Sequence, residues 1–96
     1  MNIYWTDNAI EDLLAIREYI AQNSPESADR IIDNLTNRSE QIAAFPFSGR
    51  IVPEYEDEQI REVIEGSYRI IYYVESEQVS VIAVRHGSRP ITLPEQ

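Results

Sequence analysis

The stretch YRIIYYVESEQVSVIAVR, residues 68–85, decides the fold that the sequence predicts. Residues 68–74 and 79–85 are rich in β-branched and aromatic side chains, which favour strands. The polar triplet Glu75-Ser76-Glu77 between them has the composition of a turn. The two runs therefore predict a hairpin of central strands.

Shorter extended segments flank this hairpin in the sequence. Residues 59–64 form a predicted strand, and the turn Glu65-Gly66-Ser67 separates it from the hairpin. Residues 3–5 are a plausible first strand, and Ile51-Val52 is a short extended piece. Residues 53–58 form an acidic, solvated loop.

Two helices are predicted between the first strand and the others. Thr6 and Asp7 offer an N-cap for a helix ending near Gln22. Ser24 is suited to cap a second helix that begins with Pro25 and ends near Ala44. The order predicts an α+β fold, with an N-terminal strand and an antiparallel helix hairpin packed on an antiparallel β-sheet, β-α-α-β-β-β. Residues 1–90 form one domain, and residues 91–96 an irregular tail.

Composition and charge limit the classes of function. Seventeen acidic residues against eight arginines, with no lysine, give a net charge of −9, and this field repels nucleic acid. A local basic pocket remains compatible with this charge. The chain contains no cysteine and no apolar run near the roughly 18 residues of a membrane span, and its first residues are not expected to act as a secretory signal. We therefore expect a cytoplasmic protein without membrane contact.

Candidate site residues gather at the end of the hairpin away from its turn. Arg69 on the first strand and Arg85 with His86 on the second are expected to converge at one rim of the sheet. An arginine fork there would hold a phosphate or carboxylate, and His86 would act as a general acid or base in RNA cleavage. The alternative, favoured for any single arginine, is ion pairing: Arg61 with Glu62, or Arg69 with a cross-strand glutamate. A structural or surface role is likewise favoured for His86.

Metal and cofactor sites are not predicted. Asp7, Glu11 and Asp12 are interpreted as solvated acids that favour a helix start rather than as metal ligands. The acidic run 54–58 matches no calcium loop, and the chain has no glycine-rich phosphate loop.

Several segments resemble one family when they are taken in order. These are Trp5, the helix pattern over residues 9–21, Asn23-Ser24-Pro25 with Ala28, the loop of residues 45–50, Arg61-Glu62-Val63, residues 68–72, and residues 79–84 followed by His86-Gly87-Ser88-Arg89. Together they resemble the RelE/ParE toxins of type II toxin–antitoxin systems. The resemblance runs from about Ile3 to Arg89 and implies the fold given above.

The resemblance implies a toxin that a cognate antitoxin of the ParD or RelB type neutralises. The Phe-Pro-x-x-Gly-Arg loop at residues 45–50 and the ending His86-Gly87-Ser88-Arg89 are closer to ParE-type members, which are associated with inhibition of DNA gyrase. In that interpretation the protein is not an enzyme. Its target-contact or phosphate-binding residues are Arg50, Arg69, Arg85, His86 and Arg89.

The alternative is a RelE-type endoribonuclease that cuts mRNA on the ribosome. Its catalytic residues would be His86 for proton transfer with Arg69 and Arg85, Arg50 and Arg89 would hold phosphate, and Glu54 is a remote candidate base. The chain departs from that type in its acidity and in lacking an aromatic acid–base candidate just after His86. A third interpretation is an inactive member that retains only antitoxin binding.

All three interpretations share an antitoxin partner. We expect it to lay a segment over an apolar groove beside the helix hairpin or the sheet. Charge complementarity predicts that this segment is unusually basic. Operator DNA would be contacted only by the complex, through the antitoxin.

Overall fold

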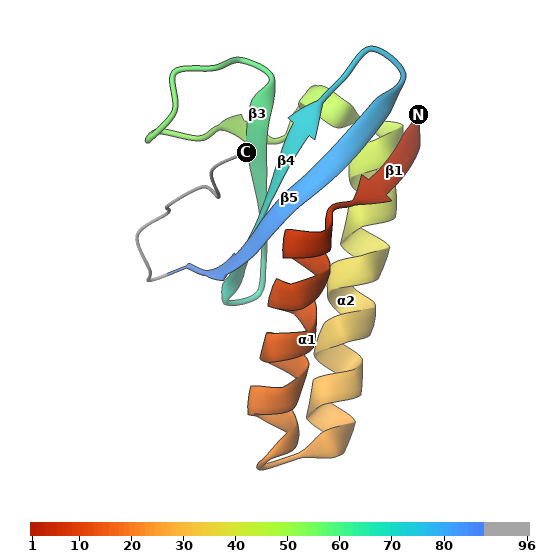
Figure 1. Cartoon of the computed structure of the whole chain (residues 1–96), viewed down its shortest axis with the longest axis vertical. Helices are drawn as coiled ribbons and strands as arrows, with labels where there is room; N and C mark the ends of the chain where they lie inside the picture. The colour runs from red at the N-terminus through yellow and green to blue at the C-terminus, as the bar shows by residue number, and fades with distance from the viewer. Residues whose placement is uncertain (88–96) are drawn as a thin grey trace.

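The computed structural model describes residues 1–87, and the predicted tail and Arg89 lie outside this part of the chain. The chain forms a five-stranded sheet with a helix hairpin on one side of it (Figure 1). The elements, in chain order, are β1 Asn2–Trp5, α1 Asp7–Ala21, α2 Pro25–Ala44, a 3-10 turn at Pro46–Ser48, β2 Arg50–Ile51, β3 Ile60–Glu65, β4 Tyr68–Val74 and β5 Gln78–His86. The predicted α+β class is confirmed.

The strand order in the sheet is β1-β5-β4-β3-β2, so the predicted hairpin β4–β5 occupies its middle. All neighbouring strands are antiparallel except β1, which lies parallel to β5 at the edge. The two-residue strand β2 adds a fourth strand after the helices and forms the other edge. The sheet is therefore antiparallel apart from one edge pair.

Both predicted helix caps are present. The Thr6 hydroxyl accepts a hydrogen bond from the Ala9 amide at 3.2 Å, and the Ser24 hydroxyl accepts one from the Ser27 amide at 3.2 Å. These bonds satisfy amide groups that the first helical turn leaves without partners. Neither helix combines the length and the hydropathy of a membrane span, within residues 1–87.

The sheet carries a hydrophobic cluster on each face. Between sheet and helices, Leu35 and Ile42 of α2 pack with Ile70 and Tyr72 of β4. On the opposite face, a smaller cluster comprises Val52, Ile71, Ile82 and Ala83, with Tyr55, Ile60 and Tyr73 packed against it. Side chains therefore alternate between the two faces along β4, as the strand period requires.

Strand β5 contains a bulge that breaks this alternation. Ile71 pairs with Ala83, but the next residue, Tyr72, pairs with Val81, so Ile82 is an extra residue. Val81 and Val84 consequently belong to the helix-side cluster, while Ile82 and Ala83 belong to the other. The bulge thus decides on which face the functional end of β5 presents its side chains.

Candidate functional site

The ends of β4 and β5 bring the predicted residues to one rim of the sheet. Tyr68 pairs with His86, and Arg69 pairs with Arg85. The two arginine side chains nevertheless bind different carboxylates. The rim therefore consists of two separate ion-pair clusters rather than one arginine fork.

The first cluster surrounds Glu62 of β3, which is 1% exposed. One carboxylate oxygen accepts hydrogen bonds from Arg69, one of them from Nε at 3.1 Å, and the other oxygen binds Arg50. Glu54 lies 3.6 Å from the Arg69 guanidinium. The formal charges of the two arginines and two glutamates in this cluster sum to zero. Because Arg69 is buried, the fold requires its pairing with Glu62.

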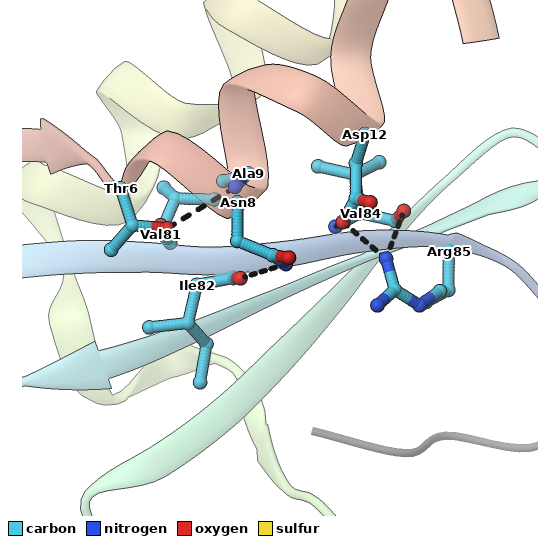
Figure 2. A network of polar contacts seen from close by, with 8 residues as sticks. All are labelled: Thr6, Asn8, Ala9, Asp12, Val81, Ile82, Val84 and Arg85. Carbon is cyan, nitrogen blue, oxygen red and sulfur yellow. Dashed lines mark hydrogen bonds and ion pairs between the residues drawn. The ribbon is translucent and has the colours of Figure 1, made fainter. Parts of the chain in front are cut away.

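The second cluster joins β5 to helix α1. The Asp12 carboxylate forms an ion pair with Arg85 and accepts a hydrogen bond from the Val84 amide at 3.0 Å (Figure 2). Asp12 is therefore not a solvated helix-start acid, and that prediction is wrong. Its side chain reaches the sheet because α1 lies directly against β5.

The N-terminal turn of α1 also holds the bulge. The Asn8 amide nitrogen donates to the Ile82 carbonyl at 3.1 Å, and the Thr6 hydroxyl donates to the Val81 carbonyl at 3.0 Å (Figure 2). A bulge leaves backbone groups without ladder partners, and the Asn8 side chain supplies one of the missing bonds. Helix α1 therefore positions both the bulge and the arginine that follows it.

His86 lies beside an open groove between α1 and the sheet end. Its ring contacts Tyr68 edge-on, with 5.7 Å between the ring centroids. The groove has a volume of about 680 Å³ and is lined by Asp12, Ala15, Ile16, Tyr19, Tyr68, Val84, Arg85 and His86. Tyr19 is 71% exposed, which is unusual for a large aromatic side chain and suits a contact surface.

Arg61 makes contacts that the sequence did not predict. Its guanidinium lies 5.0 Å from the centre of the Phe47 ring and donates to the Gly49 carbonyl at 3.1 Å. The expected pairing with Glu62 is wrong, because adjacent residues of a strand point to opposite faces. The expected pairing of Arg69 with a cross-strand glutamate is confirmed by Glu62.

A buried tyrosine fixes the loop before β2. The Tyr72 hydroxyl donates to the Pro46 carbonyl at 2.7 Å and accepts from the Gly49 amide at 3.1 Å. Burial raises the pKa of Tyr72 above its ordinary value of 10.0, and the Gly49 amide partly opposes that rise. These two bonds hold the loop backbone at Pro46 and Gly49 against β4.

Sequence reasoning missed Asp12 and Tyr72 as organising residues, and it named Glu62 only as a partner for Arg61. A usable signal existed for Glu62, which stands between the apolar Ile60 and Ile64 on one side of a strand. No local signal marks Asp12, because its partner is 73 residues away.

Residues 3–91 match the family described as the ParE toxin of type II toxin-antitoxin system, parDE. The chain belongs to this family. It is 36% identical over 88 residues to Toxin RelE2 of Caulobacter vibrioides, a match covering 91% of this chain and 96% of that protein. The predicted membership of the RelE/ParE toxins is thereby confirmed.

Solved structures share the fold of this ParE-family chain. One is the chromosomal ParDE TA system from P. aeruginosa, with a TM-score of 0.74 and 20% identity over 90% of this chain and 95% of that one. Another is the toxin-antitoxin complex RelBE2 from Mycobacterium tuberculosis, with a TM-score of 0.63 and 19% identity over 88% of each chain. These likenesses show that the fold is shared.

Proposed function

We propose that this ParE-family toxin inhibits DNA gyrase by protein–protein binding, without catalysis. The observation that carries the proposal is the pairing of Arg50, Arg69 and Arg85 with carboxylates of the same chain. An RNA-cutting site needs cationic groups free to stabilise charge that develops on the phosphorus. Here three of the four predicted arginines are already paired with carboxylates.

The electrostatic field supports the same proposal. A net charge of −9 repels the phosphate backbone of RNA, whereas it is compatible with a protein target. In addition, the His86 ring packs edge-on against Tyr68 at the groove. We propose Arg50, Arg69, Arg85, His86 and Arg89 as the target-contact residues. Among the arginines that form ion pairs within residues 1–87, Arg50 has the most exposed side chain.

We further propose that a cognate antitoxin occupies the groove between α1 and β5. Ile16 and Tyr19 of α1 and Tyr68 of β4 give the groove an apolar surface. Two acidic residues of α1, Glu11 and Glu18, lie close to it. Those acids flank Ala15 because residues three and four apart are neighbours on a helix. A basic, amphipathic antitoxin segment fits this surface. The ParDE and RelBE2 names of the similar structures are in keeping with such a partner.

A supercoiling assay with purified gyrase tests the target. We expect the toxin to inhibit supercoiling in proportion to its concentration and to leave mRNA intact on programmed ribosomes. The matched pair Arg50→Gln and Arg17→Gln separates target contact from general charge, since Arg17 lies in an ion pair with Asp29 on the helices. We expect weaker gyrase inhibition only for Arg50→Gln.

The opposite results identify the alternatives. If the protein cleaves mRNA without inhibiting gyrase, and His86→Ala loses the cleavage, the RelE-type activity would be established. The 36% identical relative is named Toxin RelE2. No effect in either assay, with antitoxin binding retained, would indicate an inactive toxin that serves only as a binding partner.

A further inference from the structure

Strand β2 forms one edge of the sheet that residues 1–87 build. It is the last strand in the order, and within these residues its only neighbour is β3. The Val52 amide donates to the Ile60 carbonyl at 3.3 Å, so its backbone faces β3. Because successive residues of an antiparallel strand point their backbone groups to opposite sides, the amide and carbonyl of Ile51 face away from the sheet.

Large apolar side chains are exposed beside this edge. Phe45 is 70% exposed, Phe47 57% and Ile51 41%. Ile51 pairs with Arg61, whose guanidinium stacks on Phe47, so these side chains lie on the same face of the sheet. An open edge with an apolar flank is the arrangement that an added strand requires.

Acidic residues lie in the loop that follows the edge strand. Glu56, Asp57 and Glu58 lie in the connection from β2 to β3, and none of them forms an ion pair within residues 1–87. Glu56 and Glu58 are exposed. The end of the free edge therefore carries unbalanced negative charge.

We propose that the β2 edge binds an extended segment of a partner protein in which apolar residues alternate with lysine or arginine. The segment adds a sixth strand by hydrogen bonding to Ile51. Its apolar side chains cover Phe47 and Ile51, and its cations contact Glu56 and Glu58. This inference does not depend on gyrase inhibition, and it concerns a surface separate from the groove beside Tyr19.

A second copy of the chain is a poor occupant of this edge. Two molecules of net charge −9 repel each other, and a β2–β2 contact would bring two acidic loops into one neighbourhood. A cationic partner instead gains attraction from the same groups. Charge therefore selects a basic partner over self-association.

Amide exchange with two designed peptides tests the proposal. One eight-residue peptide alternates valine with lysine, and the matched peptide carries glutamate in place of lysine. We expect the lysine peptide to slow exchange of the Ile51 amide and the glutamate peptide to leave it unchanged. Added NaCl should weaken the binding, because the acidic side chains are exposed.

Two substitutions give the matched variants. Ile51→Pro removes the backbone amide that faces away from the sheet and leaves the amides that donate to β3 in place. We therefore expect about tenfold weaker binding of the lysine peptide. Tyr4→Ser alters an exposed aromatic residue on β1, at the opposite edge of the sheet, and should leave binding unchanged. If Ile51→Pro does not fold, amide exchange of the unaltered protein with each of the two peptides still tests the proposal.

Three results would overturn the proposal. If both peptides protect the Ile51 amide equally, charge does not select the partner. If a saturating concentration of the lysine peptide gives no protection, the edge is not a binding site. Protection of Ile51 that grows with protein concentration in the absence of peptide would make a second copy the occupant. None of these results bears on the supercoiling assay.

Discussion

At the scale of single residues, Gly49 shows how closely the loop approaches the sheet. A Cβ atom there would lie 2.4 Å from the Tyr72 hydroxyl oxygen and 2.6 Å from the Glu62 carbonyl oxygen. We expect Gly49→Ala to lower the free energy of unfolding by about 1–3 kcal/mol through overpacking, measured by urea denaturation.

The control for Gly49 is a double-mutant cycle. Tyr72→Phe removes the hydroxyl that the new methyl group meets, so Gly49→Ala should cost less in the Tyr72→Phe background. The backbone contact with Glu62 remains, so the rescue should be partial. Equal costs in both backgrounds would contradict the steric explanation.

Glu62 carries a second prediction at this scale. Its carboxylate is buried and binds Arg69, which is 8% exposed. Glu62→Gln leaves the buried Arg69 with only the more distant, partly exposed Glu54 as counter-charge and should destabilise the fold by about 3 kcal/mol. Arg50→Gln removes the exposed partner of the same carboxylate and should cost about 0–1 kcal/mol. Similar losses from the two variants, measured by thermal unfolding, would refute this account of the cluster.

At the scale of elements, Asp12 connects α1 to β5. Its carboxylate binds the Val84 amide and Arg85 together, just beyond the bulge. We expect Asp12→Ala to speed hydrogen exchange of the Val84 amide and to cost about 1–3 kcal/mol, since a charged acceptor is lost. The neighbouring Glu11→Ala serves as the control and should leave that amide unchanged. Unaltered exchange in Asp12→Ala would show that the helix does not hold the end of β5.

At the scale of the whole molecule, net charge opposes compactness. Seventeen acidic residues outnumber eight basic ones, and the excess negative charges repel one another more strongly in the folded state. Salt screens that repulsion. We expect the thermal midpoint to rise by a few degrees on adding NaCl, as followed by circular dichroism. Glu56→Gln combined with Glu58→Gln should reduce this dependence. A midpoint that falls with NaCl would mean that exposed ion pairs, such as Arg17–Asp29, dominate instead.

Local sequence determined the elements of this protein and their approximate bounds. Strand β4 and helix α2 have the predicted limits, Tyr68–Val74 and Pro25–Ala44, because each is set by residues within a few positions. Ser24 and Pro25 define a helix start by satisfying or removing nearby amide donors. The residues that resemble the RelE/ParE toxins also lie in such local segments, so the family followed from sequence.

Only the tertiary structure decided how the arginines are partnered. Arg69 and Arg85 were expected to converge, and their positions do pair across β4 and β5, yet their side chains bind Glu62 and Asp12. The bulge at Ile82 changes the face of every later residue in β5, and no local propensity encodes it. Contacts between Asp12 and Arg85 join positions 73 residues apart. The sequence by itself thus determined the elements and the family, whereas the pairing of β3 with its neighbours and the packing of α1 on β5 decided which carboxylates the arginines bind.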